Sequence, residues 1–419
     1  MKIVLAAKSV YPFHPYGGVQ KYVYYFAKHL LQAGLEVEIV APLDGGKPRT
    51  EYFEGIPYTL IGPCISSYLE LPVGWLGVHW FARNLARYLK DKQFDILHSF
   101  DMAGLYYLDV TGRKPVIAHI FSDNYLCNPI AVTKYLELFG YKPDDIKKAK
   151  IALSPFADPK TIARYPAQYF FKTRPMRRYL AGCEQVFVEA EHFQEEVIGL
   201  FRLDPAKVRA VPVGVDVGYV RQRMDASAMT KAQLGFTPAD LVLLTVNRLA
   251  ADKGIDNMIL ALGMVRKSLP MAKLLIVGKG YQEQELVSLA AARGLTEHVR
   301  MVKDVREEDL YGYYKISDLY ICAFSFPGSS ISTLEAMACG LPVVTTAQPW
   351  LVTGARNGIF IPNNEPETIT AAVLGLARGD LKVKGGVSVE VAKDYDWPAI
   401  VQKAKPAYAD QLDGKRRKP

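Results

Sequence analysis

The sequence predicts an α/β protein with two domains, each built on a parallel sheet. The chain has 419 residues, 50% of them apolar, which suffices for two domains of about 150 to 200 residues with a core each. Within residues 1–41, an apolar strand, a helix and another strand follow one another. In the second half, apolar strands end in loops rich in glycine and basic residues. Such β-α-β units give parallel sheets that bind ligands at the carboxyl ends of their strands.

The net charge and the cysteine content indicate which partners and which cell compartment to expect. Lysine and arginine (51) outnumber aspartate and glutamate (43), and the net charge of +8 favours an anionic partner. We expect an anionic membrane surface or an acidic substrate such as a nucleotide sugar, and no nucleic acid, because no nucleic-acid-binding motif is present. Five scattered cysteines predict neither a zinc site nor disulfides, as is typical of the reducing cytoplasm. No stretch is long enough to span a bilayer, and the apolar N-terminal run is too short for a signal peptide.

A glycine pair follows the first predicted strand. Residues 1–7 form that strand, and a helix is expected over 19–33, ending at Gly34. Gly17 and Gly18 therefore lie at the carboxyl edge of the sheet, where the lack of side chains lets a phosphate or an acceptor approach the backbone. The alternative is an ordinary loop with two glycines.

Polar side chains lie at or after the ends of two further predicted strands, residues 95–98 and 115–120. They are His98, His119 and Asp123. A histidine at such a position is a candidate for binding a ligand or polarising a reacting group. Taken singly, each is more often structural.

Two stretches combine aromatic and basic residues. In residues 57–90, tryptophan, phenylalanine and aliphatic residues precede a helix with Arg83 and Arg87, and residues 160–180 interleave tyrosines with basic residues such as Arg177. This pattern suits a protein that lies on an anionic membrane. Core aromatics with basic residues on the opposite, solvated face explain it equally well.

A pair of cations follows the first strand of the second half, residues 241–246. Arg248 and Lys253 lie in the loop between that strand and the next helix. An arginine fork and a lysine point charge at this place can hold a diphosphate. The alternative is a surface ion pair with Asp252 or Asp256.

The segment 325–346 is expected to present a helix N-terminus to a ligand. Small residues, Gly328 to Ser330, precede a helix over 332–338 that has a serine cap and ends at Gly340. Free amides at such an end bind anions. Glu335, about one turn into the helix, can reach a hydroxyl of the same ligand. The alternative is an ordinary capped helix whose glutamate faces water.

Four motifs occur in the order typical of one family. Tyr16–Gln20, Asn247–Leu249 with Lys253–Ile255, Val277–Gly280, and Leu334–Val344 together resemble the group-1 (family 4) glycosyltransferases of the GT-B fold. The resemblance extends from about residue 1 to about residue 410. It implies two Rossmann-like domains facing a cleft, residues 1–212 on the acceptor side and 213–395 binding the nucleotide sugar. It also implies a helix over 396–412 that crosses back to the first domain, followed by a basic tail, 413–419.

The resemblance assigns roles to particular residues. Arg248 and Lys253 are expected to stabilise the leaving nucleoside diphosphate, Glu335 to bind the ribose hydroxyls, and the loop 303–306 to hold the base through its backbone. No metal or other cofactor is implied, because the two cations neutralise the diphosphate. The full set of expected donor-binding residues is Gly17, Gly18, Arg248, Lys253, Gly278, Val305, Gly328, Ser329, Ser330, Ile331 and Glu335.

Two positions depart from the family pattern. Ser122 stands where many members have a loop histidine that contacts the transferred sugar, and Pro327 replaces a glutamate eight residues before Glu335. The change is compatible with an unusual donor sugar, with a different catalytic arrangement that uses Asp123 or His119, or with a protein that binds without turnover.

We therefore expect a glycosyltransferase that acts in the cytoplasm, at the inner face of the membrane. By resemblance, it moves a sugar from a UDP- or GDP-linked donor to a lipid-linked or polysaccharide-precursor acceptor, with retention of configuration. The alternative is a GT-B-like protein that binds a nucleotide sugar as a scaffold. An epimerase or a phosphorylase is disfavoured because the acid/base set or lysine-bound cofactor that each needs is not found.

Overall fold

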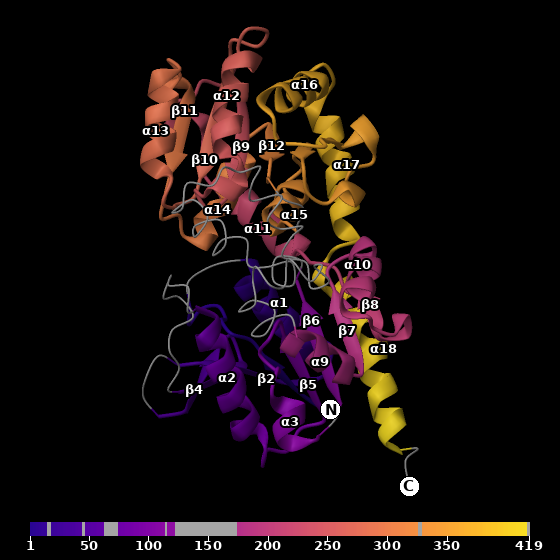
Figure 1. Ribbon diagram of the computed structural model, residues 1–419. Helices are drawn as coiled ribbons and strands as arrows, with labels where there is room; N and C mark the ends of the chain where they lie inside the picture. Colours follow the sequence, from indigo (N-terminus) through magenta and orange to yellow (C-terminus); the bar gives the residue numbers. More distant parts are fainter. Residues whose placement is uncertain are drawn as a thin grey trace, which may run out of the picture. The chain divides into compact units, whose positions relative to one another are not determined.

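The computed structural model describes residues 1–14, 18–43, 47–62, 74–113, 115–121, 174–325 and 329–416. Five residues singled out from the sequence lie outside them: Gly17, Ser122, Asp123, Pro327 and Gly328. The chain divides into two compact units (Figure 1). Unit 1 comprises Met1–Pro212 and Trp397–Pro419, and unit 2 comprises Val213–Asp396.

Unit 1 contains an eight-stranded sheet in the order β3-β4-β2-β1-β5-β6-β7-β8. Each neighbouring pair is parallel except β3 with β4. On either side of β1, Ile3 pairs with Val37 of β2 and with Ile96 of β5. The strands are β1 Lys2–Ala6, β2 Glu36–Pro42, β3 Arg49–Phe53, β4 Ile56–Ile61, β5 Ile96–Phe100, β6 Val116–Ile120, β7 Gln185–Val188 and β8 Val208–Ala210.

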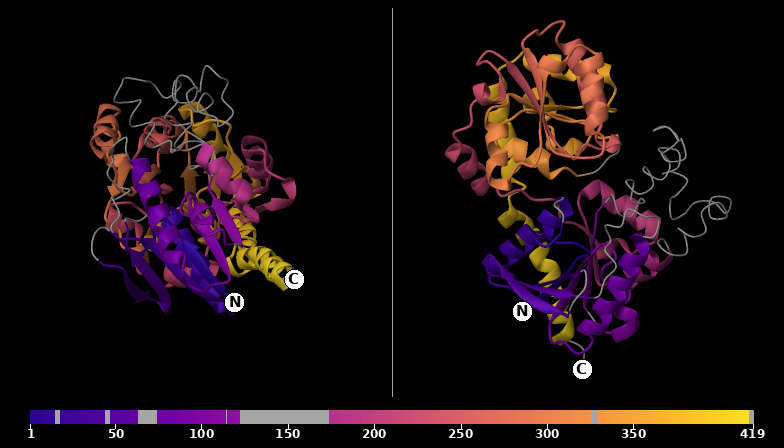
Figure 2. Two further views of the ribbon diagram at one scale, coloured as in Figure 1. Left: turned by 60° about the horizontal axis from the view of Figure 1, so that its bottom comes forward. Right: turned by 90° about the vertical axis from the view of Figure 1, so that its left-hand side faces the viewer.

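Helices complete unit 1, and the last one comes from the end of the chain (Figures 1 and 2). The C-terminal helix α18 packs against α1, where the ring of Trp397 stacks on that of Tyr25 with centroids 6.0 Å apart. Farther along α18, the Tyr408 hydroxyl lies 2.6 Å from Nδ1 of His98 on β5. The end of the chain is therefore part of unit 1. The helices are α1 Gly18–Gln32, α2 Gly74–Leu89, α3 Tyr107–Thr111, α9 Arg174–Gly182, α10 Glu191–Phe201, η2 Pro205–Lys207 and α18 Trp397–Arg416.

Several residues that the sequence offered to a membrane lie in the core of unit 1. Ile61 ends the buried strand β4, and Phe81 and Tyr179 are buried on α2 and α9. The amphipathic α2 turns Trp80 and Arg83 outward. Thus the outer faces of these helices remain as membrane candidates among the described residues, and neither the Trp75 side chain nor residues 160–173 are described. Among the described helices, none is long and apolar enough to cross a bilayer.

Unit 2 contains a six-stranded, entirely parallel sheet in the order β11-β10-β9-β12-β13-β14. The chain runs outward from β9 to β11 and then returns to start again at β12, so the order reverses between β9 and β12. Such a reversal opens a ligand crevice at the carboxyl ends of the two central strands. The strands are β9 Leu241–Val246, β10 Ala272–Val277, β11 Val299–Val302, β12 Leu319–Cys322, β13 Val343–Thr345 and β14 Gly358–Phe360.

Helices cover both faces of this sheet and bury its central strands (Figure 1). Leu243 of β9, Leu274 of β10 and Ile321 of β12 belong to one apolar core cluster with residues of α12 and α16. The α-helices are α11 Val217–Ala226, α12 Ile255–Val265, α13 Glu283–Ala292, α14 Glu307–Lys315, α15 Ile331–Ala338, α16 Pro366–Ala377 and α17 Leu381–Lys393. The short 3-10 helices are η3 Lys231–Leu234, η4 Ala251–Lys253, η5 Thr296–His298, η6 Pro349–Leu351 and η7 Gly354–Arg356.

Candidate active site

The candidate site lies at the carboxyl edge of the unit 2 sheet. The loops after β9, β10, β11 and β12 all emerge there, because the strands are parallel. They carry Arg248, Gly278, Val305 and the residues leading into α15. Tyr320 on β12 links the end of β9 to α15: its hydroxyl lies 3.5 Å from the Val246 carbonyl and 2.8 Å from Oγ of Ser332.

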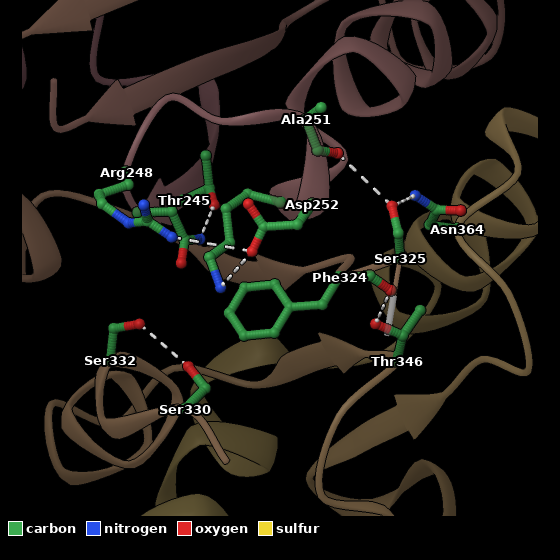
Figure 3. A network of polar contacts seen from close by, with 12 residues as sticks. Thr245, Arg248, Ala251, Asp252, Phe324, Ser325, Ser330, Ser332, Thr346 and Asn364 are labelled. Carbon is green, nitrogen blue, oxygen red and sulfur yellow. Dashed lines mark hydrogen bonds and ion pairs between the residues drawn. The ribbon is translucent and has the colours of Figure 1, made fainter. Parts of the chain in front are cut away.

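Arg248 and Lys253 meet on one carboxylate (Figure 3). Nη2 of Arg248 lies 3.8 Å from Oδ2 of Asp252, and Nζ of Lys253 lies 3.2 Å from the same oxygen. The Arg248 side chain is 46% exposed and that of Lys253 16%. The ion pair with Asp252, which the sequence left as the alternative to a ligand site, is thus present. It also brings the two predicted cations together at the edge of the sheet, where a diphosphate could contact both.

An aromatic ring completes the surroundings of Lys253. Its Nζ lies 3.8 Å from the centroid of the Phe324 ring, a cation–π contact. Phe324 is buried at the end of β12, and Oγ1 of Thr346 donates a hydrogen bond of 2.9 Å to its carbonyl. This contact could not be predicted from the sequence, because the two residues are far apart in the chain.

The backbone around Arg248 is fixed by the neighbouring β10 loop. The amides of Asn247 and Leu249 donate hydrogen bonds of 3.0 Å to the carbonyls of Val277 and Lys279. Gly278 has φ +145°, and a Cβ there would overlap the Asn247 carbonyl. The structure therefore gives this glycine a packing reason, the close approach of two loops, apart from any contact with a donor.

The loop after β11 leaves backbone groups available. Within the described residues, neither the amide nor the carbonyl of Val305 has a hydrogen-bond partner. The exposed ion pair of Lys279 with Asp304 (2.7 Å) joins this loop to the β10 loop. An exposed pair of this kind adds little to stability, because water screens the two charges. The loop can thus offer one donor and one acceptor to the edge of a base.

The N-terminus of α15 is capped as expected, but one of its predicted amides is occupied. Oγ of Ser330 accepts a hydrogen bond of 3.2 Å from the Thr333 amide. The Ser330 amide itself donates to Oε1 of Gln348 (2.9 Å), so it is not free for a phosphate. In the described part of this segment, the first-turn amides of Ile331 and Ser332 keep no intrahelical acceptor. These two amides are available to an anion at this end of the helix.

Glu335 is buried rather than exposed to water. The residue is 5% exposed, and two tyrosines of α14 lie against its carboxylate. The hydroxyl of Tyr314 donates to Oε2 at 3.2 Å and that of Tyr311 to Oε1 at 3.4 Å. Burial, followed by the nearby carboxylate, raises the pKa of Tyr314 well above its usual value, so this tyrosine stays a donor. The interpretation that Glu335 faces water is wrong, and sequence reasoning missed both tyrosines.

Of the predicted site residues in unit 1, the structure describes His98, His119 and Gly18. The His119 ring is completely buried, stacks on Phe121 with centroids 5.0 Å apart, and lies edge-on to Tyr22. Burial, together with His98 at 3.3 Å, holds the pKa of His119 well below its usual value. We therefore correct the catalytic candidate His119 to a neutral core residue. Gly18 is the first residue of α1 and is exposed.

Known families and relatives match both halves of the chain. A family model described as Glycosyltransferase Family 4 matches residues 16–219, and one described as Glycosyl transferases group 1 matches residues 228–381. The D-inositol 3-phosphate glycosyltransferase of Segniliparus rotundus is 28% identical over 236 residues, 54% of this chain and 51% of the relative. A GDP-mannose-dependent alpha-(1-6)-phosphatidylinositol monomannoside mannosyltransferase of Mycolicibacterium smegmatis is 29% identical over 178 residues, 40% and 46% of the two chains. The chain thus matches about half the length of these two curated relatives.

Solved structures match over the full length. Sucrose-phosphate synthase from Thermosynechococcus elongatus has a TM-score of 0.72 at 17% identity, covering 99% of both chains. Anabaena HepE in complex with UDP and glucose has a TM-score of 0.65 at 16% identity, covering 98% of this chain and 100% of the other. At these identities the likeness shows the fold alone. The fold class expected from the sequence is confirmed, and the chain belongs to the group-1 (family 4) glycosyltransferases of the GT-B fold.

Proposed function

We propose that the chain transfers a sugar from a nucleotide sugar to an acceptor hydroxyl, with unit 2 as the donor-binding domain. The observation that carries this proposal is the meeting of Arg248 and Lys253 at the reversal point of the sheet (Figure 3). Breaking the bond between sugar and diphosphate leaves negative charge on the leaving oxygen. Cations held in place beforehand stabilise that charge as it develops, without reorganising.

The two cations suit different parts of the leaving group. The half-exposed guanidinium of Arg248 can bind two phosphate oxygens at once, whereas the Lys253 ammonium acts as a point charge. The amides of Ile331 and Ser332 add the positive end of α15. We propose that these groups need no metal ion, because they supply the charge that a metal would supply.

The donor is proposed to carry uracil or guanine. The mycobacterial relative is named for GDP-mannose, and HepE is described in complex with UDP. In this chain, the Val305 backbone offers one donor and one acceptor to a base. Glu335 is assigned to the ribose hydroxyls by its place in the first turns of α15, and Tyr311 and Tyr314 hold its carboxylate in position.

The acceptor is proposed to be lipid-linked, or a polysaccharide precursor, and the configuration to be retained. The mycobacterial relative is named for phosphatidylinositol monomannoside, a glycolipid. On unit 1, α2 exposes Trp80 (47%) next to Arg83 and Arg87, and α9 exposes Arg177 and Arg178. An indole and several cations on one outer surface suit contact with anionic headgroups. We propose that this surface brings the enzyme to its acceptor at the inner face of the membrane.

Donor turnover tests the proposal. UDP- and GDP-linked sugars are incubated with the chain, with and without glycolipid acceptors, and released nucleoside diphosphate is measured. We expect release by the parent, and a loss of about 100-fold in Arg248→Ala or Lys253→Ala, the usual effect of removing one charge-stabilising group. Lys393→Ala is the matched control, because Lys393 is exposed and, within the described part of the chain, pairs only with Glu390 of its own helix. Nucleotide binding without release or transfer would support the scaffold alternative instead.

A further inference from the structure

We propose that Asp252 and Phe324 are positioning residues that together hold the Lys253 ammonium at the place where the leaving diphosphate forms. This inference rests on the proposed function and adds two residues to it. Neither side chain is expected to contact the donor. Their effect is exerted through Lys253.

Lys253 is confined on two sides. Oδ2 of Asp252 lies 3.2 Å from its Nζ, and the Phe324 ring centroid lies 3.8 Å from the same atom. Figure 3 shows the ring of Phe324 between the Asp252 carboxylate and the start of α15 at Ser330. A free lysine has a flexible four-carbon stem and loses conformational entropy when it is ordered. Here the carboxylate and the ring order it before any ligand arrives.

Arg248 is held less firmly. Its distance to Oδ2 of Asp252 is 3.8 Å, beyond hydrogen-bond length, and nearly half of its side chain is exposed. Among the described residues, this is the only ion pair of its guanidinium. Because arginine is a rigid fork, it can turn as a unit onto a phosphate. Lysine has no such fork and depends on its surroundings for direction.

Asp252 and Phe324 lie on two loops whose backbones are in contact. The Ser325 amide, directly after Phe324, donates a hydrogen bond of 2.9 Å to the Asp252 carbonyl. Oγ of Ser325 in turn accepts from Nδ2 of Asn364 at 3.3 Å (Figure 3). A Cβ at Gly254 would overlap the Ala323 carbonyl, so the backbones of the two loops touch. The carboxylate and the ring therefore keep a fixed separation.

This arrangement has two opposite effects on the reaction. The Asp252 carboxylate competes with the diphosphate for both cations, so it weakens the binding of nucleoside diphosphate. The same carboxylate directs the Lys253 ammonium, so it speeds the step in which the leaving charge develops. A residue needed only for folding would lower binding and turnover together. Binding and turnover must therefore be measured separately.

The test uses Asp252→Asn and Phe324→Leu, with Asp256→Asn as the control. Asp256 lies in the first turn of α12, and its replacement removes the same charge without touching Lys253. Calorimetry with UDP and GDP gives the dissociation constant, and donor turnover gives kcat and KM. Thermal melting of each variant checks that it is folded.

For Asp252→Asn, we expect nucleoside diphosphate to bind about threefold to tenfold more tightly while kcat falls about tenfold. For Phe324→Leu, which leaves the charge unchanged, kcat falls about threefold to tenfold and the dissociation constant changes by less than about twofold. Asp256→Asn should change neither quantity.

Equal losses of binding and turnover in Asp252→Asn, or behaviour like that of Asp256→Asn, would overturn the inference while leaving the proposed function standing. If the parent binds nucleotide without turnover, the inference still predicts tighter binding by Asp252→Asn. Unchanged binding by this variant would overturn it. If the parent binds neither UDP nor GDP, the proposed function and this inference fail together.

Discussion

The buried contact between Tyr314 and Glu335 gives a sharp prediction for Tyr314→Phe. The substitution removes one oxygen, which donates 3.2 Å to Oε2 of Glu335 and lies 3.4 Å from the Ser332 carbonyl. A hydrogen bond to a charged group contributes about 1.5 to 3 kcal/mol in net terms, and its loss leaves a nearly buried carboxylate with fewer donors. We expect the free energy of unfolding to fall by about 2 kcal/mol, because Tyr311 retains its own bond to the carboxylate.

Thermal unfolding and calorimetry together measure this effect. For a domain of about 150 to 250 residues, 2 kcal/mol corresponds to a Tm lower by about 4 to 8 °C. If Glu335 binds ribose, the misplaced carboxylate also weakens nucleotide binding. Tyr313→Phe is the control, since Tyr313 is half-buried on the same helix and does not contact Glu335. A Tm change equal to that of Tyr313→Phe would refute the argument that the tyrosine supports the glutamate.

Three further predictions concern other parts of the molecule. Gly278→Ala should destabilise unit 2 by more than about 2 kcal/mol, seen as a lower Tm, because the added carbon overlaps the Asn247 carbonyl; an unchanged Tm would contradict the close approach. Burial lowers the pKa of His98 to about 3, so the unfolded chain binds this proton first on acidification. The pKa of the neighbouring His119 is also held well below its usual value, so both histidines act in the same direction. Stability is then full above about pH 6.5 and falls below it by up to about 1.4 kcal/mol per pH unit for each histidine; denaturant unfolding should show this slope, and a slope that is unchanged in His98→Gln would assign it elsewhere. Trp80→Ser combined with Arg177→Glu and Arg178→Glu should reduce binding to anionic vesicles at least tenfold; equal binding of parent and variant would remove the membrane surface from the proposal.

The strands predicted at residues 1–7, 95–98, 115–120 and 241–246 and the helix predicted at 19–33 are confirmed, because hydrophobic period and loop residues carry that information locally. Arg248 and Lys253 could be placed at one edge for the same reason: parallel strands bring their carboxyl ends together. The serine cap of α15 could be predicted as well, because it depends only on neighbouring residues. What the sequence predicted well is thus decided within a few residues.

Contacts between distant segments could not be predicted in this way. Phe324 contacts Lys253, and Tyr314 contacts Glu335, although the partners are far apart in the chain. Such contacts produce no periodic pattern in the sequence. His119 was a plausible site residue by its position on a strand, but Tyr22 and Phe121 bury it from other segments. Both kinds of error, the site residues that were missed and the histidine that was wrongly favoured, therefore come from contacts between segments that are distant in the chain.

Part of the membrane surface predicted from the sequence is buried for the same physical reason. Apolar residues near a basic helix have the same pattern whether they pack inward or meet lipid, and β4 and Phe81 pack inward. The outward faces of α2, with Trp80 and Arg83, and of α9, with Arg177 and Arg178, keep the original interpretation. Hydrophobicity alone did not distinguish the two cases, because the sequence does not say which face is covered.

The central claim is that unit 2 binds a nucleoside diphosphate at the carboxyl edge of its sheet. Isothermal calorimetry with UDP and with GDP, on the parent and on Glu335→Ala, tests it most directly. We predict micromolar binding of one of the two nucleotides by the parent and binding at least tenfold weaker by the variant, because the ribose loses its partner. Failure of the parent to bind either nucleotide, or binding that is the same in Glu335→Ala, would contradict the donor site described here.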